Sequence, residues 1–487
     1  MRKLLVILGI PVDDVTTPEA IDRIRAMVHE GRQTGKTHLV VTVNSDFCVK
    51  ALRDQELRMI LQEADLATAD GMPLVWASQL LGIGLRERVT GADLVPRIAS
   101  IAADEGYRVF LLGAAPGVAA KAAEQLVREH PGLQIAGVLS PPYAPLLEMD
   151  PGMAAKVSEA KPDILLVAFG NPKQEKWISM HAATLKVPVA MGVGGTLDFV
   201  AGATLRAPSW MQRSGLEWLY RLMREPRRLW RRYVSDLTNF AYFFGRQWWR
   251  LRARRSDGTP LATTRGDMIR DMAVISVSGR LDASTRSSLV AEAEQALAIT
   301  PELAVDLRDA TFVDSAGIGA LVALAKQARD QGGDLFLLAV PRPIQETLQL
   351  IKLDSFFQIL PSPQHADEAR TRRAQPYAVA RSNAHEGEAA LEMPRRIDAA
   401  SVAAMREAVE RALVQNPRVT LDLSETVFLS SAGIAAMVSL NRLAVQEGGG
   451  LRLVGCSPDI ARTLRLLKLD QVMPIQARNQ DHAKQST

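Results

Sequence analysis

The chain has 487 residues, of which 47% are hydrophobic and 23% charged, and its formal net charge is +4. These proportions are ordinary for folded protein, so they exclude a wholly disordered chain, and the length predicts two to four domains. The two cysteines, Cys48 and Cys456, lie far apart without other metal-ligand residues at suitable spacing, which excludes a disulfide framework and a zinc site.

Residues 1–205 alternate short β-rich runs with amphipathic helical segments. The apolar run near the N-terminus is short and lacks a cleavage site, so we interpret it as a strand and not as a signal peptide. The predicted strands are Leu4–Leu8, His38–Thr42, Arg108–Leu112, Gln134–Val138, Ile164–Phe169 and Val187–Met191, with helical patterns such as Val118–His130 between them. This alternation predicts a Rossmann-like α/β domain with a parallel sheet and ligands beyond the carboxyl ends of its strands.

Polar and glycine-rich segments follow the predicted strands. Thr42 and Asn44 offer hydrogen-bonding groups after the second strand. Asp70 lies in an Ala-Asp-Gly turn before a helix, where it is either a turn or N-cap residue or a general base for an acceptor hydroxyl. The Gly192–Thr196 loop, with Gly194 and Gly195, would let the backbone approach a diphosphate, although it does not match the dinucleotide fingerprint.

Two further segments carry charges near these loops. Pro172 predicts a helix start with Lys173 and Gln174 in its first turn, where backbone N–H groups favour an anion. Alternatively, Lys173, Glu175 and Lys176 form a solvated face and Trp177 is core. Arg88 and Asp93 either bind a sugar or phosphate or form an ordinary surface ion pair.

Residues 206–255, called the arm below, hold thirteen arginines, no lysine and three acids, a local charge of +10, so the remaining residues sum to about −6. Five of the seven tryptophans lie in the arm. Interleaved arginine and aromatic residues favour a helix that meets phosphates and a membrane surface. Nucleic-acid binding and a packed helical hairpin with a solvated basic face are the alternatives. Helical spacing would place Arg221, Arg228 and Arg231 on one stripe.

After a predicted linker at 256–266, the sequence repeats with a constant offset of 116 residues. Two copies of a small α/β module are predicted at 267–361 and 388–478, joined by a polar linker at 362–387 and followed by a tail at 479–487. The matching segments are Arg280–Ala283 with Arg396–Ala399, Ser315–Ile318 with Ser431–Ile434, and Lys352–Asp354 with Lys468–Asp470.

Residues 5–245 resemble the WecG/TagA/CpsF glycosyltransferases. The resemblance rests on Thr42-x-Asn44, Ala69–Gly71, Arg88–Asp93, Phe169–Trp177, Gly192–Gly195 and Gly215–Tyr233. It implies inverting transfer of a sugar, usually from a UDP-sugar, to a polyprenyl-diphosphate-linked acceptor in surface polysaccharide assembly, with no metal or cofactor required. It also implies that Asp70 is the base, that Thr42, Asn44 and Gln174 position substrate, and that Arg221, Arg228 and Arg231 reach the diphosphate.

The repeated module resembles the STAS domain of anti-sigma-factor antagonists, through Asp306–Gly319 and Asp422–Ala435. The resemblance implies that Ser315 and Ser431 open a helix and accept phosphate from a partner kinase. The alternative is that each serine is simply an N-cap. The second copy departs from the pattern because Ser430 stands where the first has Asp314.

These features together predict a UDP-sugar-dependent hexosyltransferase for exopolysaccharide synthesis, moving an N-acetylhexosamine or a hexose. No apolar run is long enough to span a bilayer, so we expect a cytoplasmic protein bound peripherally to the inner face of the cytoplasmic membrane. The STAS pair would regulate or recruit it through a kinase or an anti-sigma-like partner, and no nucleic acid is expected. The alternative is an inactive transferase half within a phospho-switched signalling scaffold, but the placed motifs are intact.

Overall fold

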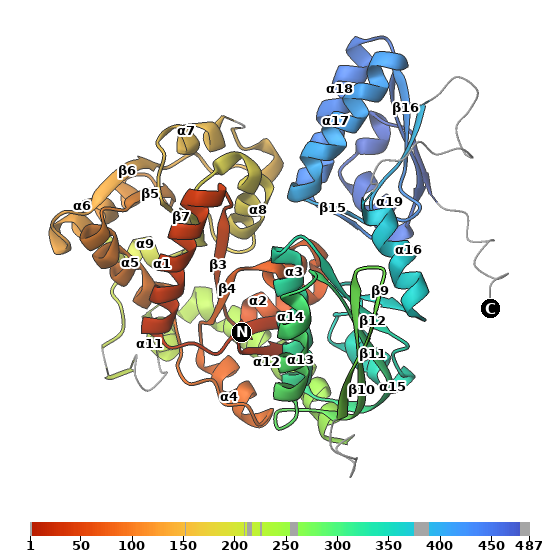
Figure 1. Ribbon diagram of the computed structural model, residues 1–487. Helices are drawn as coiled ribbons and strands as arrows, with labels where there is room; N and C mark the ends of the chain where they lie inside the picture. The colour runs from red at the N-terminus through yellow and green to blue at the C-terminus, as the bar shows by residue number, and fades with distance from the viewer. Residues whose placement is uncertain are drawn as a thin grey trace. The chain divides into compact units, whose positions relative to one another are not determined.

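The computed structural model describes residues 2–150, 152–208, 210–211, 217–224, 226–253, 262–374 and 389–477 (Figure 1). The chain forms two compact units. One comprises Met1–Ile178 and Thr184–Asp367, and the other comprises Ser179–Ala183 and Glu368–Thr487. The predicted transferase domain and the first STAS-like module therefore belong to one compact unit.

A six-stranded parallel sheet forms the centre of the transferase region, in the order β4-β3-β8-β7-β5-β6. Its strands are β3 (His38–Val43), β4 (Leu66–Ala69), β5 (Arg108–Gly113), β6 (Gln134–Leu139), β7 (Ile164–Ala168) and β8 (Val189–Gly192). Helices cover both faces, because Val109 and Leu111 of β5 join one core while Phe110 and Leu112 join another. The predicted α/β fold with a parallel sheet is confirmed.

The helices of this region follow the alternating pattern of the sequence. Helices α1 (Thr17–Thr34), α5 (Gly91–Glu105), α6 (Val118–Glu129) and α9 (Thr196–Val200) contribute to one core. Helices α7 (Met153–Glu159) and α8 (Lys173–Leu185) pack on the opposite face, beside a third core with α2 (Ser45–Arg53), α3 (Gln55–Glu63) and α4 (Met72–Leu80). The short 3-10 helix η1 (Leu146–Glu148) follows β6.

The prediction that Leu4–Leu8 joins the parallel sheet is wrong. Strand β1 (Leu4–Ile7) pairs antiparallel with β2 (Ile10–Asp13) in a separate hairpin. Leu8 and Gly9 both have positive φ, 49° and 80°, as a two-residue turn of the primed type requires. The sixth strand of the parallel sheet is β4, which the strand pattern of the sequence did not indicate.

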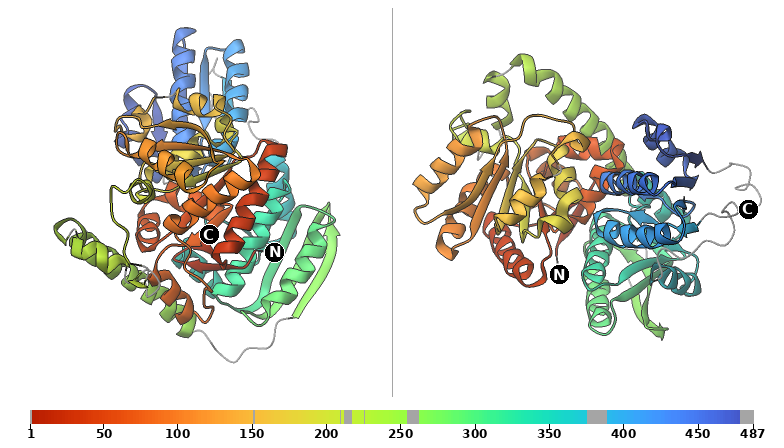
Figure 2. Two further views of the ribbon diagram at one scale, coloured as in Figure 1. Left: turned by 90° about the vertical axis from the view of Figure 1, so that its left-hand side faces the viewer. Right: turned by 90° about the horizontal axis from the view of Figure 1, so that it is seen from above.

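The arm folds into α11 (Glu217–Arg224) and α12 (Pro226–Ala253), drawn in yellow-green in Figure 2. The rings of Trp218 and Tyr233 meet edge to face, with centroids 6.4 Å apart. Trp218 and Tyr233 are fifteen residues apart, which would be about 22 Å along one straight helix. The chain therefore bends between these two residues, where Pro226 begins the second helix. None of the described helices is long and apolar enough to cross a membrane.

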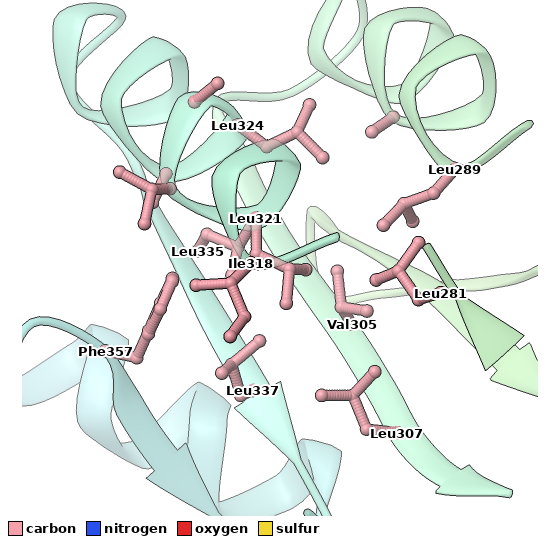
Figure 3. Packing of buried hydrophobic residues seen from close by; sticks show 14 of the residues in the cluster. Leu281, Leu289, Val305, Leu307, Ile318, Leu321, Leu324, Leu335, Leu337 and Phe357 are labelled. Carbon is pink, nitrogen blue, oxygen red and sulfur yellow. The ribbon is translucent and has the colours of Figure 1, made fainter. Parts of the chain in front are cut away.

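The first module has a five-stranded sheet in the order β13-β12-β11-β10-β9. Its elements are β9 (Ala262–Ile269), β10 (Met272–Leu281), α13 (Arg286–Leu297), β11 (Glu302–Val313), α14 (Ser315–Asp330), β12 (Asp334–Leu338), α15 (Arg342–Leu350) and β13 (Gln358–Leu360). Figure 3 shows Ile318 and Leu321 of α14 packed among Val305, Leu335 and Leu337. Part of the expected linker at 362–387 is helical, as α16 (Pro363–Ala374).

The second module repeats this order in a separate unit. Its elements are β14 (Ala389–Glu392), β15 (Arg396–Ile397), α17 (Ala399–Gln415), β16 (Arg418–Asp422), β17 (Phe428–Leu429), α18 (Ser431–Gln446), β18 (Gly450–Cys456), α19 (Pro458–Leu466), η2 (Leu469–Gln471) and β19 (Ile475–Ala477). Helices α14 and α18 begin and end at equivalent positions of the repeat. The internal repeat of the sequence is therefore a repeat of structure.

Candidate active site

A cavity of about 1220 Å³ opens where β3, β4, β7 and β8 end, and the arm helices α11 and α12 form part of its wall. The carboxyl ends of parallel strands meet at one edge of a sheet, which brings loops distant in sequence together. Seven of the predicted site residues line this cavity: Thr42, Asn44, Asp70, Arg88, Gln174, Gly194 and Gly195.

Asp70 lies directly after β4, and its backbone N–H donates to the carbonyl of Val43 at 2.7 Å. Its side chain is half-buried and lines the cavity. Helix α4 has Gly71 at its N-cap position and no side-chain capping bond, so the N-cap interpretation of Asp70 is wrong. Within the described ranges, no group of three or more His, Cys, Asp or Glu side chains is arranged to hold a metal ion.

Thr42 and Asn44 flank the end of β3. Thr42 is buried and lines the cavity. Asn44 caps α2, because its Oδ1 accepts a hydrogen bond from the N–H of Phe47 at 3.0 Å. The side-chain carbonyl of Asn44 is therefore occupied by the helix cap, and the side-chain NH2 group is the candidate donor for a ligand.

Gln174 ties two loops together at the floor of the cavity. Its Oε1 accepts from the N–H groups of Gly170 and Gly194, both at 3.1 Å, and its Nε2 donates to Oε1 of Glu175 at 2.7 Å. Glu175 is completely buried, its Oε2 has no hydrogen-bond partner among the described residues, and desolvation raises its pKa to about 7. The solvated-face interpretation is therefore wrong for Glu175, whereas Trp177 is core as that interpretation held.

Lys173 does not line the cavity, although the sequence places it in the first turn of α8. Its Nζ donates to the carbonyl of Ala144 at 2.5 Å and lies 4.5 Å from the ring centroid of Tyr143. Desolvation lowers the pKa of Lys173. The sequence suggested that Lys173 would face an anion in the cavity. Its side chain instead points at the loop that holds Tyr143 and Ala144.

Glu217, at the start of α11, joins the arm to the sheet domain. Its carboxylate lies 3.5 Å from Nη1 of Arg88 and 3.7 Å from Nε of Arg206. Arg206 in turn donates to Asp93 at 2.5 Å. Arg88 and Asp93 therefore both pair with arm residues, and these ion pairs hold the arm against the rim of the cavity.

The arm contributes aromatic side chains to the cavity, among them Trp218, Trp230 and Tyr233. The side chains of Arg221 and Arg228 lie outside the described part of the structure, and Arg231 is exposed and outside the cavity lining. Arg221 belongs to α11 and the other two to α12, so the three do not lie along one continuous helix, and the predicted stripe of their side chains falls outside the described residues. Arg224, which the sequence analysis did not single out, does line the cavity.

The two candidate phosphorylation sites differ in accessibility. Asp314, not Ser315, caps α14, and its Oδ1 accepts from Ala316 and Gly317 N–H groups. Ser315 is 2% exposed, and its Oγ has no hydrogen-bond partner within the described part of the chain. Ser430 caps α18, while Ser431 is half-buried. The N-cap interpretation is therefore wrong for both serines, and the serine that better fits the motif is the less accessible one.

Comparison with known proteins gives three family matches. The Glycosyl transferase WecG/TagA/CpsF family matches residues 5–254, the Mlab STAS domain matches 267–361, and a STAS domain matches 380–482. Among solved structures, the anti-sigma factor antagonist SpoIIAA in its unphosphorylated form is 19% identical, with a TM-score of 0.21, covering 23% of this chain and 97% of that one.

Two curated relatives carry the name N-acetylglucosaminyldiphosphoundecaprenol N-acetyl-beta-D-mannosaminyltransferase. The protein from Bacillus spizizenii is 36% identical over 200 residues, which are 41% of this chain and 76% of the relative. The protein from Staphylococcus aureus (strain MW2) is 32% identical over 239 residues, 48% of this chain and 90% of the relative. With its strand-end cavity, its arm and a family match across half its length, the chain belongs to the WecG/TagA/CpsF family of glycosyltransferases and carries two STAS domains after the catalytic region.

Proposed function

We propose that this glycosyltransferase moves an N-acetylhexosamine or a hexose from a UDP-sugar to a polyprenyl-diphosphate-linked acceptor, with inversion, in surface or exopolysaccharide synthesis. The observation that carries the proposal is a half-buried carboxylate, Asp70, in a cavity also lined by a glycine-rich loop and an aromatic arm. The cavity of about 1220 Å³ exceeds that of an ordinary single-ligand pocket, so it has room for donor and acceptor head groups together.

Asp70 is the base in this proposal. Its carboxylate takes the proton of the acceptor hydroxyl, the oxygen attacks the anomeric carbon, and the bond to the nucleotide diphosphate breaks with its electron pair on the departing UDP. Asp46, Asp198, Glu217 and Asp236 also line the cavity, and the choice of Asp70 among these acids rests on the family resemblance and on its place directly after β4.

The remaining site residues hold the substrates. In this proposal Thr42 and Asn44 at the end of β3 and Arg88 before α5 contact the substrates, and the N–H of Gly195 faces the diphosphate, while Gly194, whose N–H donates to Gln174, lets the backbone come close; all five residues line the cavity. Gln174 acts through its bonds to Gly170 and Gly194, which fix the two loops. Arg221, Arg228 and Arg231 are the arm residues proposed to supply positive charge for the diphosphate; Arg231 lies outside the cavity lining, so it acts only once the arm moves or the substrate reaches it, whereas Arg224 already lines the cavity.

The acceptor and the location follow from the relatives and the arm. The relatives are named for transfer to N-acetylglucosaminyldiphosphoundecaprenol, which supports a lipid diphosphate acceptor and an N-acetylhexosamine donor here. Trp249 is 69% exposed, Trp210 62% and Tyr242 60%. Exposed aromatic side chains on a basic helix favour binding at the inner face of the cytoplasmic membrane.

The STAS domains form the regulatory part of the proposal, through a kinase or an anti-sigma-like partner. Ser315 and Ser431 are the candidate phosphate acceptors. Because Ser315 is buried, its phosphorylation requires the first STAS domain to open, whereas Ser431 is half-buried.

A donor screen tests the proposed reaction. The full chain is incubated with a polyprenyl-diphosphate-linked N-acetylglucosamine and a panel of UDP-, GDP- and dTDP-sugars, and nucleotide release is measured with and without acceptor. We expect acceptor-dependent release from a UDP-N-acetylhexosamine. Release from a GDP- or dTDP-sugar alone would contradict the donor assignment.

A further inference from the structure

Strand β1 is shared between two hydrophobic cores. Leu4 and Val6 belong to the core of the first STAS domain, whereas Leu5 and Ile7 belong to the transferase core that also holds Phe240 and Phe244 of α12. Successive residues of a strand point to opposite faces, so one face of β1 packs on the STAS domain and the other packs on the core that carries the arm. The apolar run at the N-terminus is thereby explained.

One face of α14 docks on this hairpin and on the end of α3. We call Gly319, Lys326 and Arg329 the docking face, since their spacing places them on one side of the helix and each meets the hairpin or α3. A Cβ at Gly319 would lie 2.2 Å from the carbonyl oxygen of Leu4, so helix and strand backbones are in direct contact.

The docking face also carries two basic side chains, Lys326 and Arg329, and burial lowers the pKa of Lys326 to about 7. Lys326 Nζ donates to the carbonyl of Ala64 at 2.7 Å, and Arg329 lies 2.9 Å from Glu63. Both partners are at the C-terminal end of α3, where unpaired carbonyls favour positive charge.

The first STAS domain also contacts the turn of the hairpin, through Ile351 and Lys352. Gln62 Nε2 donates to the carbonyl of Gly9 at 3.0 Å and to that of Lys352 at 3.2 Å. A Cβ at Gly9 would lie 2.0 Å from the carbonyl oxygen of Ile351. The first STAS domain therefore contacts both ends of β1.

The second STAS domain lacks these features at the equivalent positions. Ala435 replaces Gly319, Arg442 replaces Lys326, and Val445 replaces Arg329. Ala435 and Arg442 are exposed, and Val445 is 57% exposed. The close backbone approach is thus specific to the first copy and is not a general requirement of the fold.

Gln247 joins the hairpin to the arm. It is 1% exposed, its Nε2 donates to the carbonyl of Val6 at 3.1 Å, and its Oε1 accepts from the N–H of Leu8 at 2.8 Å. Farther toward the start of the same helix, Trp230 and Tyr233 line the cavity. Contacts therefore run without interruption from α14 through β1 to the helix that forms the cavity wall.

We propose that the first STAS domain is a positioning element of the transferase in cis: its docking on β1 holds the hairpin where Gln247 binds it, and so fixes α12 over the cavity. The catalytic consequence rests on the proposed function. Anything that displaces the docking face loosens α12 and weakens binding of the acceptor, so this domain controls the enzyme from within the chain.

Hydrogen exchange of the full chain tests the coupling. Gly319→Ala forces a methyl group against Leu4, and we expect protection of residues 4–13 and 226–253 to fall at least about tenfold, as overpacking of a tight contact does. Ala435→Gly is the matched control at the equivalent position and leaves both segments unchanged. Because α18 carries alanine there, Gly319→Ala should leave protection of β11 and β12 intact. Loss of protection in the hairpin with a fully protected α12 would overturn the proposal.

A second variant, Gln247→Leu, tests the contact between the hairpin and α12 separately from the contact between α14 and β1. It also provides the test if Gly319→Ala does not fold. It removes both bonds to the hairpin, one to Val6 of β1 and one to Leu8 of the turn, so we expect reduced protection of 226–253 with the docking face of α14 still protected. The KM for the lipid acceptor should rise about tenfold while the KM for the donor stays within about twofold, because the strand-end loops are untouched. Wild-type protection of α12 in this variant would contradict the role of Gln247. If the wild-type chain releases no nucleotide from any donor, the proposed function fails, while the exchange measurements still decide the coupling.

Discussion

Gln174 and Glu175 are adjacent in sequence and bonded through their side chains, with Nε2 of Gln174 donating to Oε1 of Glu175 at 2.7 Å. The pair lies close behind Gly192, where a Cβ would approach both side chains to 2.6 Å. Glu175 therefore fixes the orientation of the amide that joins the loops at Gly170 and Gly194.

The buried carboxyl of Glu175 gives the protein a pH-dependent stability. Its pKa is raised from 4.5 to about 7, so the folded state holds this proton more tightly than the unfolded state does. The resulting stabilisation is complete below the unfolded pKa and is lost as pH rises through about 7. We predict that Glu175→Gln, which keeps the acceptor oxygen and removes the titration, raises the melting temperature at about pH 8.5 more than at about pH 5.

The control for this prediction is Glu124→Gln, which changes an exposed glutamate of α6. It should leave the melting temperature unchanged at both values of pH. Equal shifts in the two variants would show that the pH dependence does not come from Glu175.

Membrane binding is predicted to depend on exposed aromatic residues of the arm. Deleting the arm would remove Phe240, Phe244 and Gln247 from buried positions, so point substitutions are the better test. Replacing Tyr242 and Trp249 by serine should lower binding to anionic vesicles at least about tenfold, since each loses apolar area that enters the interface. Vesicle flotation measures this, with Val414→Ser, an 89% exposed position of the second STAS domain, as control. Undiminished flotation of the double variant would remove the arm from membrane binding.

A negative charge at position 315 is predicted to destabilise the larger unit. Ser315 is 2% exposed, and its Oγ has no hydrogen-bond partner among the described residues, so Ser315→Asp would bury a carboxylate where no donor already stands. An unpaired buried charge costs several kcal/mol, and we expect a clearly lower melting temperature and lower turnover. Ser431→Asp, at the half-buried equivalent, should change neither. Identical behaviour of Ser315→Asp and wild type would show that the site tolerates phosphate without opening.

The sequence predicted the parallel sheet and the strand-end residues well because both follow from local patterns. Buried parallel strands appear as apolar runs, and the polar loops after β3 and β7 stand out against them. Leu4–Leu8 has the same apolar appearance for another reason, since its two faces pack on two different cores. No pattern within the run distinguishes these cases.

Other features depended on contacts that a sequence does not display. The four residues of β4 are too few and too small in side chain to indicate a strand, and only pairing with β3 defines it. The burial of Glu175 and the direction of Lys173 follow from packing around α8. The bend of the arm, in contrast, was available from Pro226, because proline lacks the N–H that a continuing helix needs.

The most direct test of the account is turnover of Asp70→Asn with a UDP-N-acetylhexosamine and a polyprenyl-diphosphate-linked acceptor. The asparagine keeps the size of the side chain but cannot take the proton, so we predict a loss of at least about 100-fold in acceptor-dependent UDP release, with an unchanged melting temperature. Asp198→Asn, which changes another acid lining the cavity, should retain turnover within about tenfold of wild type. Wild-type turnover in Asp70→Asn would contradict the proposed mechanism.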